Sequence, residues 1–298
     1  MIEVDVGLIA QRFDDLEVQD LFQELKAQNI TCVFFSTSQV NIRTTRPWFT
    51  LSDGTILDDL DAGLVRGLGA SDLEHTIFRV DVLHALSLAG IPLVNSPRSV
   101  ELAADKTFSS VLFSLNGIPT PPTIVIESIE DGLKGFEELG GDVVVKPMFG
   151  SQGRGIDRAT TKVEALRIFQ DRLKNDQVIY MQKFIPCMKD DAFYDIRVFV
   201  IGSEVVAAMY RVNTSWKTNI HAGGRPEPCI LTPELEELSI RVSKIIGCEV
   251  AGIDIIETEE GPYVLEINSV PGWRGIQRVV DVDIPYLYVD YVKTKVKR

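Results

Sequence analysis

The pattern of apolar and polar positions predicts strands and helices that alternate along the first hundred residues. Short apolar runs at 4–10, 31–35 and 62–66 are typical of buried strands. Segments 15–28 and 77–88 carry apolar residues at helical spacing, with polar residues between them. Strands that alternate with helices usually belong to parallel sheets, so this region predicts a parallel α/β sheet.

Two glycine-containing segments predict turns within this region. Asp53-Gly54 lies between apolar runs and predicts a hairpin over residues 48–57. Gly67 and Gly69 directly follow the third strand, where glycine permits a tight turn of the backbone.

The next hundred residues begin with a clear helix start. Ser96 and Pro97 suit the cap and the first position of a helix, and Asn116-Gly117 suits the end of the next one. A proline-rich connector follows at 118–122. Beyond it, the pattern predicts a strand at 123–126, a helix at 129–139, a strand at 142–146, a glycine-rich loop at 150–155, a helix at 163–173 and a strand at 177–184.

From about residue 194 the pattern changes to antiparallel hairpins. Two pairs of strands, each joined by a short turn, are expected at 195–201 with 204–211 and at 250–257 with 263–268. Helices are expected at 233–246 and 284–296. A chain of 298 residues is long enough for several cores. We therefore predict three lobes, at 1–96, 97–187 and 188–298.

Charge and composition narrow the classes of function. The formal net charge is −13, which disfavours binding to nucleic acid or to anionic lipid surfaces. No apolar run approaches the length that spans a bilayer, and the N-terminus lacks a signal-peptide pattern. The four cysteines form no CxxC pair, so neither a zinc site nor a disulfide framework is expected. These features together predict a cytoplasmic protein with reduced thiols.

The last predicted hairpin carries the strongest candidate for a metal site. Side chains on a strand alternate faces, so Glu266 and Asn268 share one face while Leu265 and Ile267 point into a core. A hairpin brings Asp254 beside Glu266. Hard oxygen ligands at this density suit magnesium. Spacing alone equally allows a solvent-facing polar stripe on a sheet edge, so both interpretations stay open here.

A lysine followed by a glycine-rich loop is the second candidate. Lys146 ends a continuously apolar strand, where Pro147 interrupts the ladder because it has no N–H. An ammonium group at this place can meet a nucleotide phosphate, and backbone N–H groups of the following loop can approach phosphate oxygens. A mobile surface loop is the commoner meaning of such glycines. The loop matches neither the Walker A motif nor the dinucleotide fingerprint.

Basic residues concentrate in the C-terminal third of this acidic chain. They are Arg197, Arg211, Lys217, Arg225 and Arg274. Forked guanidinium groups suit carboxylate and phosphoryl oxygens, although each residue alone is more often a surface charge. Their placement around Asn219 and the expected metal strands predicts a shared anionic site. The Asp105-Lys106 pair, taken alone, is typical of a helix cap. No Ser-His-Asp or Cys-His arrangement follows from the spacing of the three histidines.

The order of these motifs resembles the ATP-grasp superfamily and, within it, the RimK-like amino-acid ligases. The resemblance covers roughly residues 92–298. In chain order the motifs are DK at 105–106, VVVKP at 143–147, the glycine-rich loop, YMQKFI at 180–185, DIR at 195–197, Arg211 before TNIH at 218–221, GID at 252–254 and LEINSVPG at 265–272.

The resemblance implies a role for each motif. Lys106 and Lys146 would bind ATP phosphates, and Arg211 and Asn219 would act with Lys146 in catalysis on the phosphoryl group and the carboxylate. Asp254, Glu266 and Asn268 would hold magnesium, with two ions expected and manganese as a substitute. The remaining nucleotide-binding residues would be the lid residues Gly150, Ser151, Gly153 and Gly155, the hinge residues Gln182, Lys183, Phe184 and Ile185, and Asp195 and Arg197. Lys183 stands where these ligases commonly have a glutamate, which leaves its contact to the ribose open.

The reaction implied is an ATP-dependent ligation. A carboxylate takes the γ-phosphoryl group, and the amine of L-glutamate then displaces phosphate from the acyl phosphate. Segments such as RGLG at 66–69 and PGWRG at 271–275 look most like the enzymes that add α-linked L-glutamate to tetrahydromethanopterin. We therefore expect a small cofactor-type acceptor and a homo-oligomer. A ligase that modifies a protein tail or a carrier protein is the alternative, and a non-catalytic nucleotide-binding module is a second alternative.

Overall fold

A parallel sheet forms the N-terminal unit of the computed structural model, which describes residues 4–150 and 153–296. Its strand order is β2-β1-β5-β6 and its pairs are parallel, which confirms the predicted α/β sheet. The elements of this unit are β1 (Asp5–Ile9), α1 (Leu16–Ala27), β2 (Thr31–Phe35), η1 (Thr37–Gln39), β3 (Asn41–Ile42), β4 (Phe49–Thr50), β5 (Ala62–Val65), α2 (Leu73–Leu88) and β6 (Leu93–Val94). Helix α2 begins earlier than predicted because the Asp72 carboxylate caps the N–H of His75.

The predicted hairpin over 48–57 is only partly correct. The tight turn forms, with Gly54 at a φ of 91°, and a single bridge joins Thr50 to Ile56. The ladder partner of β4 is β3 instead. The Asp58 carboxylate accepts hydrogen bonds from the backbone N–H groups of Trp48, just before β4, and Phe49, within β4. A side chain therefore takes donors that a hairpin ladder would otherwise use. Sequence spacing does not reveal this competition.

The middle unit is an antiparallel sheet covered on one face by two helices. Its strand order is β7-β10-β8-β9. The elements are β7 (Thr123–Ile126), α5 (Ile129–Glu138), β8 (Val143–Lys146), β9 (Asp157–Ala159), α6 (Lys162–Lys174) and β10 (Ile179–Lys183). Apolar residues of α5, α6 and the sheet form a separate core cluster. Strand β9 is not predicted from the sequence, because its three residues carry no apolar alternation.

The C-terminal unit is an antiparallel sheet of six strands. The order is β14-β13-β12-β15-β16, and β11 pairs with β12 beside this path. The elements are β11 (Met188–Lys189), β12 (Ala192–Ile201), β13 (Glu204–Asn213), η2 (Ile220–Ala222), β14 (Arg225–Pro228), α7 (Pro233–Ile246), β15 (Val250–Thr258), β16 (Gly261–Asn268), η3 (Ile276–Arg278) and α8 (Ile284–Lys293). One core cluster joins this sheet to α7, α3 (Pro97–Ala104) and α4 (Lys106–Leu115).

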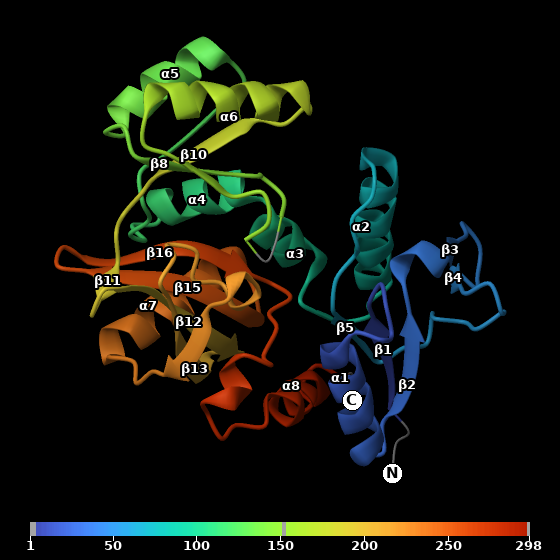
Figure 1. Ribbon diagram of the computed structural model, residues 1–298. Coiled ribbons are helices and arrows are strands. Elements are labelled where there is room, and N and C mark those ends of the chain that lie inside the picture. Colours follow the sequence, from blue (N-terminus) through green and yellow to red (C-terminus); the bar gives the residue numbers. More distant parts are fainter. Residues whose placement is uncertain (1–3, 151–152, 297–298) are drawn as a thin grey trace.

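Helix α4 lies between the middle sheet and the C-terminal sheet (Figure 1). Its residue Phe113 is buried in the core of the C-terminal unit. On the side of the middle sheet, the hydroxyl groups of Ser110 and Tyr180 are 2.9 Å apart. The helix therefore fixes how the two sheets face each other, and its first residue, Lys106, enters the space between them.

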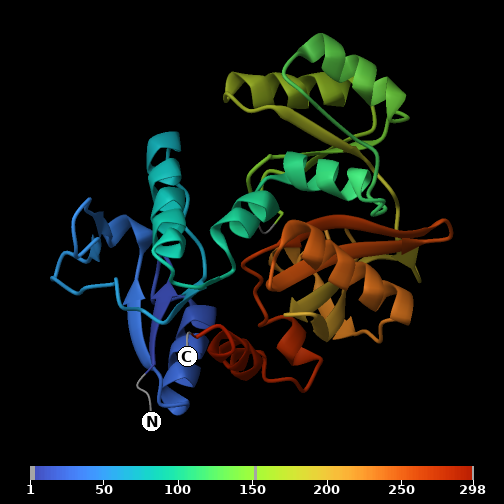
Figure 2. The same cartoon turned by 180° about the vertical axis from the view of Figure 1, so that it is seen from behind.

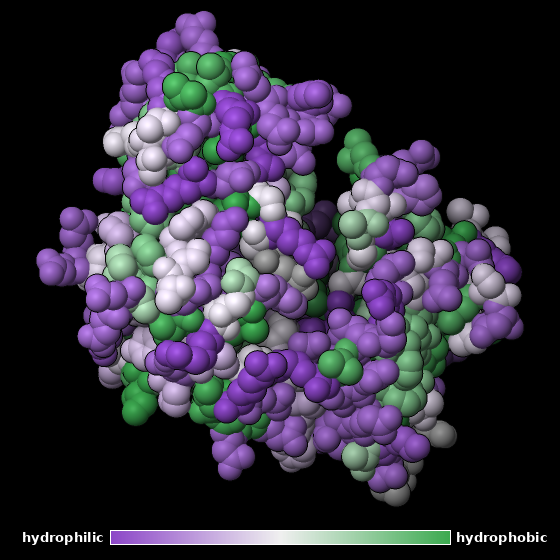
Figure 3. Space-filling view, viewed as in Figure 1, coloured by the Kyte–Doolittle hydropathy of each residue, from purple (hydrophilic) through white to green (hydrophobic). Residues whose placement is uncertain are grey.

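Helix α8 crosses back to the N-terminal unit and packs against α1 (Figure 2). Trp273 and Tyr288, both fully buried, belong to a core cluster that also contains residues of β1, α1 and β12. On the face seen in Figure 3, hydrophilic residues dominate and the surface is hollowed between the N-terminal unit and the rest. The domain boundaries proposed from the sequence stay predictions. No helix within 4–150 and 153–296 is long and apolar enough to cross a membrane.

Candidate functional site

A cleft between the middle and C-terminal sheets collects most of the predicted site residues. The charged and polar predicted residues that line it are Lys106, Lys146, Gln182, Lys183, Asp195, Arg211, Asn219, Asp254 and Glu266. The loop after β8 adds Gly150 and Gly153, and the strand end after β10 adds Phe184 and Ile185. The hairpin, the lysine and the loop were separate candidates in the sequence, and they enclose one space in the fold.

The ammonium group of Lys146 is buried in this cleft without a carboxylate partner. Lys146 is 7% exposed, and its Nζ donates to Gln182 Oε1 at 2.7 Å. Among the described residues, no carboxylate oxygen lies within ion-pair distance of Nζ. Burial lowers the pKa of Lys146, and the charge of Glu266 opposes this shift only in part. A desolvated cation of this kind suits an anionic ligand.

Two further lysines hold the loop that follows β8. Lys106 Nζ donates to the carbonyl oxygen of Gly150 at 2.9 Å, and Lys217 Nζ donates to that of Ile156 at 2.6 Å. Asn219 lies against the same loop, because a Cβ added to Gly153 would come within 2.7 Å of its Oδ1. In the part of the chain that the structure describes, these ammonium groups hydrogen-bond only to carbonyl oxygens, and Lys217 also lies over the ring of Trp216. Lys106 and Lys217 can therefore exchange these carbonyl oxygens for the anionic oxygens of a ligand.

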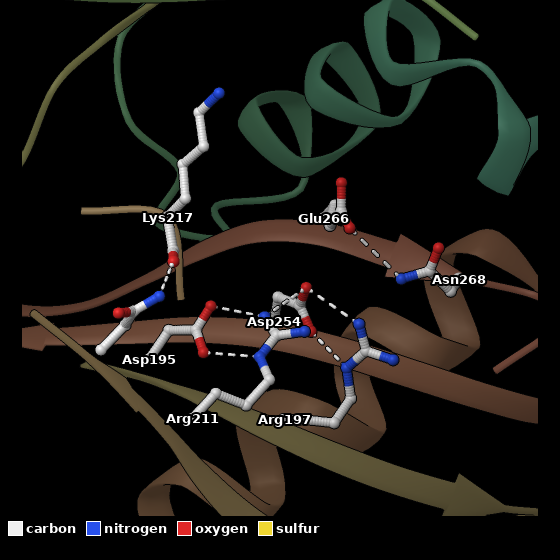
Figure 4. A network of polar contacts seen from close by, with 8 residues as sticks. Asp195, Arg197, Arg211, Lys217, Asp254, Glu266 and Asn268 are labelled. Carbon is white, nitrogen blue, oxygen red and sulfur yellow. Dashed lines mark hydrogen bonds and ion pairs between the residues drawn. The ribbon is translucent and has the colours of Figure 1, made fainter. Parts of the chain in front are cut away.

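A chain of four alternating charges lies at the floor of the cleft (Figure 4). Arg211 bonds to Asp195 through two nitrogens, with 2.7 Å from Nε to Oδ1, and reaches Asp254 at 2.8 Å. Arg197 binds both oxygens of Asp254. Burial opposes charge on Arg211 and Asp254, but the opposite charges outweigh it. They raise the pKa of Arg211 and hold the pKa of Asp254 below its usual range. Arg211 and Asp254 are therefore both charged at neutral pH.

The hairpin of β15 and β16 brings the three predicted metal ligands together. Asp254 is directly opposite Glu266, and Gly252 is opposite Asn268. The Nδ2 of Asn268 lies 3.4 Å from Glu266 Oε1. Figure 4 shows both side chains on the side of the hairpin that faces α4. Gly252 admits the Arg197 side chain, because a Cβ there would lie 2.9 Å from Arg197 Nη1.

These oxygens fit a magnesium ion. Two carboxylates and one amide oxygen form a hard donor set. The amide of Asn268 is needed for this set, because the described residues contain no group of three or more His, Cys, Asp or Glu side chains that could hold a metal ion. Asp254 is already paired with two arginines, so Glu266 and Asn268 offer the less occupied oxygens. Asn268 itself stands beside the cleft and is not part of its lining.

The prediction that Leu265 points into a core is wrong. A β-bulge shifts the register, so that Ile255 pairs with Val264 while Asp254 pairs with Glu266. Val264 is fully buried and belongs to the core, whereas Leu265 lines the cleft beside Glu266. The extra residue of a bulge breaks strict alternation, and this places two consecutive side chains on one face.

The hinge after β10 forms an apolar wall. The N–H groups of Lys183 and Phe184 donate to Pro122 and Asp142 at 2.8 and 2.9 Å. The N–H of Ile185 has no protein acceptor within the described residues, so it is the first hinge donor open to a ligand. Phe184 has the guanidinium of Arg158 3.6 Å above its ring. The other apolar members of the lining include Pro121, Val144, Phe193, Trp216, Ile256 and Leu265.

The sequence predicts only Phe184 and Ile185 of this wall as nucleotide-binding residues. Trp216 contacts Phe184 edge to face, with 6.1 Å between ring centroids, although the two residues are far apart in the chain. Phe193 makes a similar contact at 6.3 Å. An apolar, aromatic wall next to an available backbone donor suits a nucleobase.

The predicted basic cluster forms only in part. Arg225 pairs with Glu227 on the surface, and Arg274 pairs with Asp20 of α1. Only Arg211 and Lys217 of the cluster line the cleft. Spacing along the chain does not reveal that Arg225 and Arg274 each pair with a carboxylate outside the cleft lining. Arg197 lies next to Asp254 but outside the lining, as does Gly155, whose carbonyl oxygen accepts from Arg172. Ser151 lies outside the described residues.

Histidines and cysteines contribute little chemistry to the cleft. His75 pairs with Asp72 and His84 with Glu101. His221 lies in η2 and is not part of the lining. All four cysteines are free. Cys187 lines the cleft, but burial raises the pKa of its thiol, so it is unsuited to nucleophilic attack.

Comparison with known proteins decides the family. Residues 103–292 match the model of the RimK-like ATP-grasp domain. The chain belongs to the RimK-like ATP-grasp family. The predicted ATP-grasp fold is thereby confirmed, and so is the prediction of an ATP-dependent ligase. The cleft between the two sheets is therefore the candidate active site of this ligase.

RimK-like relatives resemble this chain over most of its length. The tetrahydromethanopterin:alpha-L-glutamate ligase of Methanocaldococcus jannaschii is 39% identical over 237 residues, which are 77% of this chain and 78% of the relative. The enzyme of the same name from Methanococcus maripaludis is 33% identical, with 96% of both chains covered. A structure of the ATP-grasp ligase PsnB, complexed with a precursor variant, Mg and ADP, matches with a TM-score of 0.74 at 22% identity. It covers 100% of both chains, and at this identity it shows the fold alone.

Proposed function

We propose that this ligase joins L-glutamate to the carboxylate of a small acceptor of the tetrahydromethanopterin type. The observation that carries the proposal is that two lysines without a carboxylate partner among the described residues share one cleft with two carboxylates. Lys146 and Lys106 stand on one side, and Asp254 and Glu266 stand on the other. An ATP triphosphate with its divalent ion complements both sides. The two relatives named for this activity support the choice of glutamate and acceptor.

Each site residue has a task in the proposed reaction. The apolar wall around Phe184 would receive adenine, with the free N–H of Ile185 meeting its edge. Lys106 and Lys146 would hold the phosphates. Asp254, Glu266 and Asn268 would hold magnesium, which neutralises phosphate charge when bound. Arg211 and Asn219 would meet the transferring phosphoryl group and the acceptor carboxylate.

The chemistry needs positioning and charge neutralisation more than acid–base groups. An oxygen of the acceptor carboxylate attacks the γ-phosphorus, and the bond to the ADP oxygen breaks. The glutamate amine then attacks the acyl carbon, phosphate leaves, and the amine loses a proton. A cleft with lysines and a buried arginine, and with no histidine in its lining, fits this sequence of steps.

An acceptor panel tests the proposal. The purified chain is incubated with ATP, magnesium, L-glutamate and one acceptor at a time, and the products are weighed by mass spectrometry. We expect tetrahydromethanopterin to gain one glutamyl residue, with ADP and phosphate released in equal amounts. Glutamylation of a peptide or carrier protein in place of the small acceptor would overturn the choice of acceptor.

A matched pair of variants of one hairpin links the activity to the cleft. Glu266→Gln removes a carboxylate that faces the cleft, and Glu260→Gln removes one from the exposed turn of the same hairpin. We expect Glu266→Gln to keep the fold and to lose turnover by a factor on the order of 100 to 1,000. Glu260→Gln should retain it. Equal activity of both variants at saturating magnesium would contradict the metal assignment.

A further inference from the structure

The side chain of Asn95 connects the N-terminal unit to the hairpin of β15 and β16. Asn95 directly follows β6 and is 0% exposed. Its Nδ2 donates to the carbonyl oxygens of Val250 and Ser269, both at 2.6 Å. Its Oδ1 accepts from the N–H groups of Glu249 and Val250, at 2.7 and 2.8 Å. A primary amide has two donor hydrogens and two acceptor lone pairs, so its capacity is fully used.

The four bonds lie at the open end of the hairpin. The ladder of β15 and β16 runs from the turn to the pair Gly252 and Asn268. Val250 lies two residues before Gly252, and Ser269 is the residue after Asn268. The Asn95 amide therefore links the two sides of the hairpin at the point where the β15–β16 ladder has ended. It holds the carbonyl of Ser269, next to Asn268, against the beginning of β15.

We propose that Asn95 is a positioning residue for magnesium binding, which rests on the proposed function. Without a contact to the ion, it would set the separation of β15 and β16 and so the placement of the Asn268 and Glu266 oxygens. Hydrogen bonds behind the ligands orient metal sites in this way, and their loss lowers metal affinity by about 10- to 100-fold. Asn95 supplies this support from a different unit of the chain than the ligands themselves.

Asn95→Asp is the most selective variant. The carboxylate keeps nearly the same shape and still accepts from the N–H groups of Glu249 and Val250. It replaces the donor by an oxygen that faces two carbonyl oxygens, so the link between Val250 and Ser269 is lost. The matched control is Ser243→Ala, which removes a buried hydrogen bond of 2.6 Å to the carbonyl of Cys248. Ser243 lies near the start of β15, and the hydrogen bond of its hydroxyl group to Cys248 does not involve β16.

The measurement is ADP binding to the full chain by calorimetry, with magnesium varied, together with the thermal midpoint of each variant. We expect Asn95→Asp to raise the half-saturating magnesium concentration about tenfold or more. ADP affinity without magnesium should stay at the wild-type value in both variants. Ser243→Ala should keep the wild-type magnesium dependence, even where its thermal midpoint falls as far.

The outcomes separate this inference from the proposed function. An unchanged magnesium dependence in Asn95→Asp overturns the positioning role, as does an equal shift in Ser243→Ala. If the wild-type chain binds ADP equally well with and without magnesium, the metal site is wrong and the positioning role falls with it. Should Asn95→Asp not fold, Asn95→Ser keeps a donor on a shorter side chain. An intermediate magnesium shift there supports the role, and a wild-type value overturns it.

Discussion

At the scale of the single residue, Lys146 combines an energetic cost with the phosphate-binding role that we propose for it. Its ammonium group is desolvated at the end of β8 and, within the described part of the chain, hydrogen-bonds only to Gln182. Burial lowers its pKa, so the charged form is less favoured in the free protein than in water. Triphosphate oxygens would restore the lost solvation. We therefore expect the buried ammonium group to cost stability in the free protein and to favour the binding of an anion.

Lys146→Met should therefore separate activity from folding. The change removes the desolvated charge but leaves Gln182 Oε1 without its donor, and each effect is about 1–3 kcal/mol with opposite signs. We expect the free energy of unfolding to change by less than about 2 kcal/mol. ATP turnover should fall by a factor on the order of 100 to 1,000.

Urea denaturation and an ADP-release assay measure the two quantities of the Lys146 variant. Lys162→Met is the control, because Lys162 is exposed on α6 and pairs with Glu137. It should leave turnover unchanged. Full turnover in Lys146→Met would show that the buried ammonium does not serve the nucleotide.

At the scale of the elements, β16 carries the bulge that builds the cleft face. Leu265 and Glu266 point to the same side, so one strand supplies both an apolar contact and a carboxylate. Val264 and Ile267, on either side of them, remain in the core. A regular strand would place only one of the two consecutive residues in the cleft.

Leu265→Ala should weaken nucleotide binding without much loss of stability. The side chain borders the cleft, so its removal should cost about 1 kcal/mol of binding, or about fivefold in the KM for ATP. The free energy of unfolding should change by less than about 1 kcal/mol. Ile267→Ala, the control two residues on, opens a core cavity and should lose about 2–5 kcal/mol of stability. A large stability loss in Leu265→Ala with an unchanged KM for ATP would show that Leu265 lies in the core, as it would in a strand without the bulge.

The elements that the sequence predicts well are those with strong local signals. Helix α7 has the predicted bounds because Thr232 caps it, Pro233 opens it, and Gly247 ends it at a φ of 81°. Strands β9, β11 and β14 were missed because each is short and is held by a neighbouring strand. The bulge was missed because alternation alone does not fix the register.

The site residues likewise fall into those with a local sequence signal and those brought together only by the fold. The hairpin of Asp254 and Glu266 could be predicted, because both residues lie near one turn. The pairing of Arg197 with Asp254 depends on the β12 and β15 register, which joins residues 57 positions apart. The contact of Trp216 with Phe184 likewise depends on how two units pack. Neither contact leaves a local pattern in the sequence.

At the scale of the whole molecule, one core cluster connects the N-terminal and C-terminal units. Helix α8 supplies Ile284, Tyr288 and Val289 to this cluster, and α1 and β1 supply residues from the other end of the chain. Arg66, at the end of β5, donates to the carbonyl of Pro271 at 3.0 Å and lies over Trp273. The segment that follows the predicted metal ligands is thus held by the N-terminal unit. The expected homo-oligomer stays a prediction.

Tyr288→Ala should weaken both units together. Removing a fully buried aromatic ring should cost about 3–5 kcal/mol of stability. Because the cluster is shared, hydrogen exchange of backbone amides in β1 and β12 should accelerate together. Tyr286→Ala is the control on the same helix, where the side chain is 47% exposed, and it should change little. Faster exchange confined to α8 would show that the units are stabilised separately.

The fate of the acceptor carboxylate oxygens tests the central claim most directly. The acceptor is labelled with ¹⁸O at both carboxylate oxygens and converted with ATP, magnesium and L-glutamate. Transfer of the γ-phosphoryl group to the carboxylate predicts that the released inorganic phosphate carries one ¹⁸O atom and that the amide product keeps the other. Phosphate without label, or label found in AMP, would contradict the acyl-phosphate ligation that we assign to this cleft.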